Sequence, residues 1–421
     1  MRRPLLIIFV LILFVAFIKT NQEPLNNRYT DKTITIEGIV MDKIEKEKYH
    51  QYKVSKFLVN DYSKNKKIAI GKRVRVIGKL KNLEDMKFKD FDYGKYIKSC
   101  GYKGLIYINK YEVIGESFLY TNLGKLKSKL IKNFRYLYKK NSDFLNSVLL
   151  GAKENLTQED KEIFSKTGTS HIIAISGLHI GILCTLVILI IRSINKFYKL
   201  IILSVILSLY CIMVGVSPSI VRSILFIIAL YLSIFYDKKK DGISTLSLIG
   251  IFFIINNPYI IHNISFQLSF LATLSIIYFY GYINNILKIE IISITLCANI
   301  LTLPIIYYNF KLVTINSILG NLIIVPFIGV IMYLSIISII LFNINVWVAK
   351  VVAYFNIIIM DSIYFLLNIL SRLDFTYVEV ENPKIQYVII YYGIVFSYMI
   401  YKELKVMKEQ TNELQGYYKQ Y

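Results

Sequence analysis

Long runs of apolar residues constrain this chain more than any other feature of its sequence. Residues 200–214 and 317–342 contain no charged side chain, and a helix needs about 20 apolar residues to cross the hydrocarbon core of a bilayer. Apolar residues make up 55% of the 421 residues, and the mean hydropathy is +0.50. These values exclude a disordered or collagen-like chain and argue against an ordinary soluble domain. The pattern predicts a polytopic α-helical membrane protein.

Similar apolar segments recur along the chain and predict about ten spans. Residues 4–18, behind Arg2 and Arg3, have the layout of a signal peptide. No small-x-small cleavage pattern follows them, so we interpret residues 1–20 as an uncleaved anchor with a cytoplasmic N-terminus. A transmembrane domain, 169–402, and a short tail, 403–421, complete the predicted order. The other predicted spans are 169–191, 200–215, 219–236, 243–256, 264–284, 289–308, 313–342, 345–370 and 386–402.

The run 313–342 is too long for one straight span. It contains Gly320, Asn321 and Pro326, and backbone freed from a helix at membrane depth must face protein or water. We therefore predict a broken or re-entrant helix in this run.

Positive charge in the short loops predicts the orientation of the spans, because cytoplasmic loops carry an excess of Lys and Arg. Loops assigned to the cytoplasm hold seven such residues, and those assigned to the outside hold three. We therefore expect both termini in the cytoplasm and residues 28–165 outside.

The segment that follows the anchor has the pattern of a β domain, assigned to residues 28–120. Residues 33–41 alternate between apolar and polar side chains, and 53–60, 66–80 and 104–114 are further short strands, with glycines as turns or bulges. About five short strands in this space suit a small closed barrel of the OB type. A β-sandwich fragment is the alternative.

Most of the excess positive charge lies in residues 28–140, which contain the β domain and the start of the connector that follows it. The chain has a formal net charge of +22, and residues 28–140 hold 28 Lys and Arg against 12 Asp and Glu. A basic surface of this size fits nucleic acid or the anionic surface of a membrane. A third interpretation is that the lysines serve solubility alone.

A helical connector is predicted between the β domain and the second span, within residues 121–168. Residues 122–166 are polar, with apolar side chains at helical spacing. We expect an amphipathic helix that lies on the membrane or packs across the barrel.

Residues 166–181, with the sequence KTGTSHIIAISGLHIG, are the most informative segment. On a continuous helix, His171, Ser176 and His179 share one face. The opposite face is made of small residues, which are Ser170, Ala174, Gly177 and Gly181. Small residues let a neighbouring helix approach closely, and polar residues in a span face the bundle interior or a wet cavity. We interpret the segment as helix packing and path lining. A specific contact, a Ser/His dyad and a metal site remain open, although neither GxSxG nor HExxH occurs.

Other polar residues lie at membrane depth. Arg222 lies just inside its span, either as part of a path or as an outer anchor that snorkels. Ser269 belongs to a stripe of small residues, while Gln267 points elsewhere on the same helix. Asp361 falls near the middle of a span, where a charge is costly unless it is paired or wet, and no partner can be named from the sequence.

The sequence offers no sign of a metal or redox site. The cysteines, Cys100, Cys184, Cys211 and Cys297, form no CxxC or CxxH pair. No GxxxxGKS or GxxxxGKT string occurs either, so we expect neither a cofactor nor a bound metal, and energy would come from another protein.

The string HIIAISGLH at residues 171–179 resembles the signature of the ComEC-type competence protein family. Residues 71–81 (GKRVRVIGKLK) and 91–104 (FDYGKYIKSCGYKG) resemble that family's extracytoplasmic OB-like domain, and the resemblance covers roughly residues 30–340. Further matches in the same order are Leu149-Leu150-Gly151, Thr167-Gly168, Gly215, Arg222, Pro258, SFQLSF at 265–270, Ala272, Pro304, Asn321 and Pro326.

The resemblance implies a channel in the bacterial cytoplasmic membrane that takes up one strand of transforming DNA. It implies as partners single-stranded DNA, membrane lipid, a separate DNA receptor, a helicase or translocase, and a nuclease. Larger members carry a C-terminal metallo-β-lactamase-like domain, but this sequence contains no HxHxDH string. We therefore expect a short form that is not an enzyme. The path-lining candidates are His171, Ser176, Gly177, His179, Arg222, Gln267, Ser269, Asn321 and Pro326.

On this interpretation the β domain captures the DNA strand. Its aromatic side chains either stack on bases or form the barrel core. The candidates for stacking are Tyr52, Phe57, Tyr62 and Tyr107, and those for phosphate binding are Lys66, Lys67, Lys72, Arg73 and Arg75.

Two rival classes of function remain. One is a transporter or membrane enzyme for a non-nucleic anionic substrate, such as an envelope precursor or a lipid. The other is an inactive scaffold. A basic outer domain fits the first of them as well as it fits DNA uptake.

Overall fold

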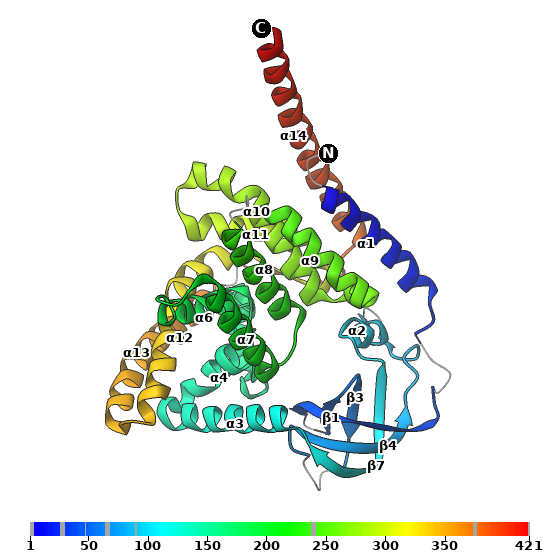
Figure 1. Cartoon of the computed structure of the whole chain (residues 1–421), viewed down its shortest axis with the longest axis vertical. Coiled ribbons are helices and arrows are strands. Elements are labelled where there is room, and N and C mark those ends of the chain that lie inside the picture. Colours follow the sequence, from blue (N-terminus) through cyan, green and yellow to red (C-terminus); the bar gives the residue numbers. More distant parts are fainter. Residues whose placement is uncertain are drawn as a thin grey trace.

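The computed structural model describes residues 4–419, apart from 26–29, 47, 64–67, 89–90, 237–240 and 374–376. An N-terminal helix, α1 (Pro4–Gln22), leads into a β-barrel, and helices make up almost all of the rest (Figure 1). The structure is therefore a helical membrane protein with an N-terminal barrel.

The barrel closes in the strand order β1-β2-β3-β7-β4. Neighbouring strands are antiparallel except β3 and β7, which are parallel. Alternating side chains such as Val40, Val59 and Val74 fill the interior and are fully buried, as the sequence pattern requires. The prediction of a small barrel is thereby confirmed. The strands are β1 (Thr33–Glu45), β2 (His50–Val54), β3 (Phe57–Asp61), β4 (Lys72–Leu80) and β7 (Gly104–Glu116).

Two details of the predicted strands differ from the structure. The predicted strand 53–60 is a tight hairpin of β2 and β3, because Ser55 adopts a left-handed turn conformation with φ 50°. The predicted strand 66–80 begins only at Lys72. Gly71 has φ +90° and lies directly against the backbone of Thr121, so this glycine sits where the barrel meets the first connector helix.

A short excursion between β4 and β7 attaches the barrel to the helices. It contains β5 (Lys87–Phe88), β6 (Phe91–Asp92) and α2 (Tyr93–Ser99). The amide of Asn257 donates to the Lys98 carbonyl over 2.8 Å. The amide of Asn263 donates to the Ser99 hydroxyl over 3.3 Å. Both asparagines flank the 3-10 helix η3 (Pro258–His262), so α2 docks on the loop between two membrane helices.

The connector consists of several helices, and the prediction of a single amphipathic helix over 122–166 was wrong. Lys139, with φ 47°, ends the first helix, and Gly151, with φ 70°, ends the second. The helices are α3 (Phe118–Tyr138), η1 (Lys139–Asn141), α4 (Ser142–Leu150), η2 (Lys153–Asn155) and α5 (Gln158–Lys166).

The end of α3 inserts between two membrane helices. The Tyr138 hydroxyl lies 2.8 Å from the hydroxyl of Ser338 and accepts a hydrogen bond from the Asn356 amide over 3.2 Å. All three side chains are fully buried. A buried polar group is costly without a hydrogen-bond partner. The hydrogen bonds among these three side chains therefore fix the end of α3 to the helix bundle. The helix therefore does not merely lie on a surface.

A helix is present at each predicted span. Six of them, α1, α7 and α10 to α13, are long and apolar enough to cross a membrane, and α6, α8 and α9 are shorter apolar helices. The count of ten spans remains a prediction. The bounds are α6 (Gly177–Ile190), α7 (Lys196–Val214), α8 (Pro218–Phe235), α9 (Gly242–Asn256), α10 (Ile264–Leu287), α11 (Glu290–Phe310), α12 (Ser317–Phe342), α13 (Val346–Ser371) and α14 (Ile385–Lys419).

The predicted break in the long run 313–342 is not observed. Residues before Ser317 leave the helix and form β8 (Leu312–Thr314), which pairs with β9 (Tyr377–Glu379). From Ser317 onward α12 is one helix that includes Pro326. A membrane bundle can tolerate the loss of the one backbone hydrogen bond that proline removes, because neighbouring groups satisfy the freed carbonyl. Its 26 residues extend about 39 Å.

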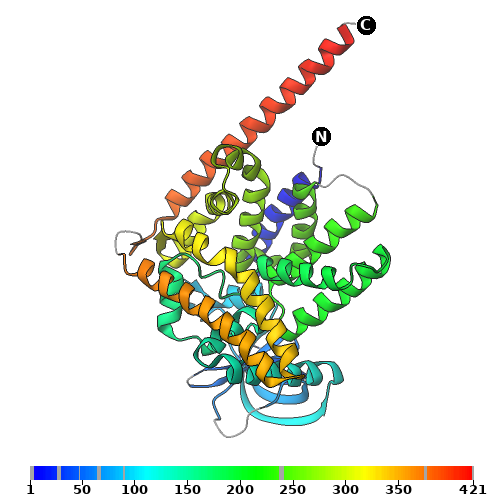
Figure 2. The same ribbon diagram turned by 90° about the vertical axis from the view of Figure 1, so that its left-hand side faces the viewer.

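Both views place the start of α1 and the end of α14 at the end of the molecule opposite the barrel (Figures 1 and 2). Which side of a membrane each end faces remains a prediction.

Candidate functional site

The signature segment is a loop followed by a helix start. Residues 170–176 are not helical, and α6 begins at Gly177. The predicted continuous helix from residue 170 was therefore wrong. Ser176 is the N-cap with an extended backbone, and its N–H donates to His179 Nδ1 over 3.1 Å. A cap residue followed three positions later by an acceptor side chain starts a helix by satisfying its free amides.

Ser176 and His179 meet, but as a helix cap. The Ser176 hydroxyl lies 2.9 Å from His179 Nδ1, the same nitrogen that accepts the Ser176 backbone amide. No carboxylate in the described part of the chain hydrogen-bonds this imidazole, so a third group to orient a catalytic base is not seen there. His171 lies on the exposed part of the loop. His179 Nε2 is fully buried and makes no hydrogen bond to the described residues.

Gly177 lies in close contact with the neighbouring helix α8. A Cβ atom there would lie 3.0 Å from Ser223 Oγ and 3.3 Å from Arg222 Nη2 of α8. Gly181, one turn later, has nothing within 4 Å of an added Cβ. Of the predicted small face, only Gly177 makes a close contact on α6. Ser170 and Ala174 do not lie on this helix, because it begins at Gly177.

Arg222 is held between α8 and α10 by hydroxyl groups. Its Nε donates to Ser269 Oγ over 2.7 Å, and its Nη1 donates to Thr273 Oγ1 over 2.6 Å. Nη2 lies 3.4 Å from Ser223 Oγ. The side chain is buried, at 8% exposure, so the alternative of a snorkelling anchor was wrong. Among the described residues no carboxylate forms an ion pair with it.

The start of the signature loop packs on α12. Gly168 lies against Ser317, and Gly320 lies under the Thr167 carbonyl. The amide of Asn321 reaches Thr295 Oγ1 of α11 over 3.2 Å. The loop at residues 167–176 therefore starts on α12, beside its contact with α11, and ends next to α8; we call this loop the strap. A further bond between α11 and α12 joins the Asn299 amide to Ser317 Oγ over 3.0 Å.

Two candidates lie apart from these contacts. Gln267 donates to the Ile261 carbonyl of η3 over 2.7 Å, so it ties a loop to its helix. Pro326 lies inside α12. Neither contacts Arg222 or the strap through a hydrogen bond in the described structure.

Asp361 has partners that the sequence did not identify. Its Oδ1 accepts from the Asn141 amide over 2.9 Å and lies 3.3 Å from Lys140 Nζ. The Asp361 side chain is 42% exposed. It therefore ties α13 to the connector at a partly wet position, where such a pair contributes modestly.

Sequence reasoning identified Ser269 but missed the other hydroxyl residues around Arg222, which are Ser219, Ser223 and Thr273. Ser219 and Ser223 on α8, and Ser269 and Thr273 on α10, are each four residues apart. Residues spaced by four lie on one helix face, so each helix presents a pair of hydroxyl groups. Repeated Ser/Thr spacing around Arg222 was the signal that could have found them.

Three of the four cations on β4, Lys72, Arg75 and Lys79, form ion pairs. Lys72 binds Glu116 over 2.8 Å, and Arg75 binds Glu37 over 2.7 Å. The hydrogen bond and charge of Lys72 lower the pKa of Glu116. Arg73 is exposed, whereas Lys66 and Lys67 lie outside the described residues. The expected free basic surface on β4 is therefore mostly a set of cross-strand ion pairs.

The aromatic candidates divide between core and surface. Tyr52 is fully buried, and its hydroxyl accepts the Ile68 N–H over 3.1 Å, so stacking on bases was the wrong alternative for it. Phe57 packs against the barrel core. Tyr62 is 51% exposed and lies 5.5 Å from the Tyr107 ring. These two belong to a surface group that also contains Tyr49, 5.0 Å from Tyr62, and Lys81, 4.6 Å above Tyr107.

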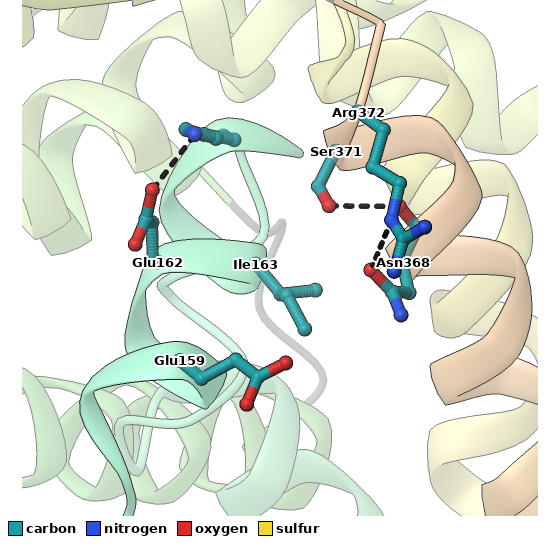
Figure 3. Close-up of a pocket in the computed structure, with 7 residues that line it drawn as sticks. Glu159, Glu162, Ile163, Asn368, Ser371 and Arg372 are labelled. Atoms are coloured by element: carbon teal, nitrogen blue, oxygen red, sulfur yellow. Dashed lines mark hydrogen bonds and ion pairs between the residues drawn. The ribbon is translucent and has the colours of Figure 1, made fainter.

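A cavity of about 370 Å³ lies between α5 and α13 (Figure 3). Lys166 on its wall pairs with Glu162 over 2.7 Å, and Arg372 donates to Asn368 over 3.2 Å. Glu159 and Arg372 project from opposite walls in the close-up. None of the candidate residues lines this cavity. The described residues also contain no group of three His, Cys, Asp or Glu side chains placed to hold a metal ion.

Fold and site together define a helical membrane protein with buried polar side chains and an N-terminal barrel. The model of the Competence protein family matches residues 148–405, more than half of the chain, and the chain belongs to this family. It is similar to ComE operon protein 3 of Bacillus subtilis (strain 168), with 28% identity over 249 residues. That match covers 56% of this chain and 31% of the relative, so the chain spans less than a third of that protein. No solved structure matches.

Proposed function

We propose that this protein is a channel component that carries single-stranded DNA across the bacterial cytoplasmic membrane. Membership of the Competence protein family supports a role related to DNA uptake. The ten-span arrangement, the cytoplasmic termini and the outward barrel belong to this proposal.

The observation that favours a single strand is the aromatic group on the barrel. Tyr49, Tyr62 and Tyr107 form a partly exposed cluster of rings 5.0 and 5.5 Å apart, with Lys81 above one of them. Bases stack on exposed aromatic rings without regard to sequence, and nearby cations attract the backbone. Duplex DNA hides its base faces, so this surface suits an unpaired strand. The strand order of the barrel, with β3 parallel to β7, supports an OB-type fold, which serves such binding in other proteins.

The polar seams among the helices supply a route for the strand in this proposal. The start of the strap packs against Ser317 and Gly320 of α12, and Gly177 after its end lies close to Arg222. Hydrogen bonds between polar side chains join α11 to α12 beside it. Ionisable side chains inside a membrane bundle often mark the pathway of an ion or a polar substrate, and Arg222 is such a residue. A partner translocase supplies the energy for transport. A separate receptor delivers the DNA, and a separate nuclease degrades the strand that is not taken up.

A deletion strain complemented with variants tests the proposal. Cells that lack the gene should lose uptake of labelled DNA, and the wild-type gene should restore it. Tyr62→Ala with Tyr107→Ala should lower uptake, because each stacked base contributes about 1–3 kcal/mol. Phe118→Ala is the matched control, since Phe118 is 85% exposed and lies outside the aromatic group.

Full DNA uptake in the deletion strain would refute the proposal. An envelope defect with normal uptake would instead favour transport of an anionic envelope precursor.

A further inference from the structure

The excursion between β4 and β7 carries a group of exposed aromatic side chains. Phe88 of β5 and Phe91 of β6 are paired directly across the hairpin, so both side chains project from the same face of it. They are 69% and 40% exposed. The Phe91 ring lies 5.6 Å from the ring of Tyr96 on α2, which is 38% exposed. We call Phe88, Phe91 and Tyr96 the aromatic tip.

The aromatic tip is held at the level where apolar helices end. Lys95 of α2 donates to the Asn21 side chain, one residue before the end of α1, over 2.8 Å. Asn257 is the C-cap of α9 and Asn263 is the N-cap of α10, and both donate to the end of α2. Because α1 and α10 are long and apolar enough to cross a membrane, their ends lie at its surface. The excursion therefore lies at the membrane surface too.

The end of α1 also lies at the rim of the helix bundle. Of the 19 residues of α1, only Phe9, Ala16 and Thr20 are buried. The Thr20 hydroxyl lies 2.9 Å from His262 Nε2 of η3, so this side of α1 faces the bundle and the remaining sides face lipid. Figure 1 shows α1 at the edge of the helices, with α2 below its end. Lipid headgroups therefore lie beside the excursion.

The charge next to the aromatic tip suits a lipid headgroup. Lys87 precedes Phe88 and is exposed. Asp92, which lies opposite Lys87 across the hairpin, caps α2 by accepting the Lys95 N–H over 2.8 Å. Aromatic rings concentrate at the level of the headgroups in membrane proteins, and lysines there are attracted to the phosphates of anionic lipids. Exposed rings beside an exposed lysine form a surface of this kind.

We propose that the aromatic tip binds the headgroup region of the membrane, in the leaflet on the side of the barrel. Phe88 and Phe91 enter the boundary between headgroups and acyl chains, Tyr96 lies among the headgroups, and Lys87 binds a lipid phosphate. The tip thereby fixes the barrel to the bilayer through lipid as well as through α1. This contact needs no DNA, so it is independent of the proposed function.

The test places a tryptophan in the aromatic tip and brominated lipid around it. The chain has one native tryptophan, Trp347, so every variant also carries Trp347→Phe. The full chain with Phe88→Trp is reconstituted in nanodiscs of phosphatidylcholine brominated near the headgroup end of its acyl chains. Bromine quenches indole fluorescence on contact, so this variant should lose most of the emission that it has in unbrominated lipid. Tyr96→Trp is a second probe and should also be quenched.

Val113→Trp is the matched control, because Val113 is 49% exposed on β7. It lies nine residues along this strand from Gly104, where the excursion rejoins the barrel, a distance of about 30 Å. Its emission should be the same in both lipids. Unchanged emission from both probes in the tip, or equal quenching of Val113→Trp, would overturn the proposal.

A charge reversal tests the part of Lys87. Quenching of Phe88→Trp should be stronger when the nanodiscs contain phosphatidylglycerol, and Lys87→Glu should abolish this gain. Lys110→Glu, at an exposed lysine of β7, should keep the gain. Equal losses in the two variants would overturn the assignment of Lys87 to a lipid phosphate.

Oligothymidine added to unbrominated nanodiscs distinguishes lipid from DNA. If oligothymidine changes the emission of Phe88→Trp and brominated lipid does not, the tip belongs to a DNA-binding surface of the barrel and the proposal is overturned. Quenching by lipid in a protein whose deletion leaves DNA uptake intact would refute the proposed function and support the membrane contact.

Discussion

Replacement of Gly177 by leucine should destabilise the protein sharply. A Cβ at this position lies 3.0 Å from Ser223 Oγ and 3.3 Å from Arg222 Nη2, so alanine already requires these side chains to yield slightly. Leucine adds three more carbon atoms in the same gap, and overpacking of this kind costs about 1–3 kcal/mol. Displacing Arg222 from Ser269 and Thr273 adds about 1.5–3 kcal/mol, because hydrogen bonds of charged groups contribute that much.

Gly181→Leu is the matched control for this change. It lies one turn later on α6 and has open space around an added Cβ. In a helix interior, leucine is favoured over glycine by roughly 0.8 kcal/mol, so this variant should be as stable as the wild type or more so. The sequence alone treats the two glycines as equivalent members of one small face.

Thermal unfolding of the purified variants, together with their levels in the membrane, measures the difference. Gly177→Leu should unfold at a lower temperature than wild type, and Gly181→Leu should not. Equal losses for the two variants would show that the close approach of α6 to α8 does not limit stability. The contact geometry described for Arg222 would then be wrong.

Two other predictions follow from the structure. Cysteines introduced at Ser63 and Lys408 should label from opposite sides, with Ser63 accessible in intact cells; labelling of the Ser63 site only after permeabilisation would reverse the topology. Burial lowers the pKa of Lys127 despite the nearby Asp42 and Glu154, so its charged form opposes folding below that pKa. Lys127→Met should therefore unfold at a higher temperature than wild type at pH 7, and the gain should shrink as the pH rises toward the usual lysine pKa of about 10.4. A gain that is constant with pH would exclude charge burial as its cause.

Features that depend on local pattern were predictable from the sequence. Each predicted span contains a helix because runs of apolar residues need no distant partner to be recognised. The barrel strands followed from alternation for the same reason. The start of α6 was missed because apolar residues lie on both sides of Ser176, so the apolar pattern alone does not show where the helix begins. The contact of Ser176 with His179 marks the start, and it is visible only in the structure.

Features that depend on distant residues were not predictable. Asp361 finds its amide partner in Asn141, 220 positions away. Arg75 is neutralised by Glu37 and Glu112, on the strands either side of it. In each case the sequence did not show which helices or strands lie side by side, and composition does not contain this information. Charge counts placed a large excess in the barrel region but not the acids that face it.

The paired cations of β4 have a kinetic consequence for any strand that passes over the barrel. A conducting surface must bind its cargo well enough to admit it and loosely enough to release it. Lys72 and Arg75 already form ion pairs with carboxylates of the barrel. A phosphate can bind either cation only by displacing its carboxylate, and the carboxylate binds again when the phosphate leaves. Exchange of this kind shortens the residence time of each contact. Under the proposed function, a barrel with the same lysines and no facing acids would capture DNA more tightly and release it more slowly.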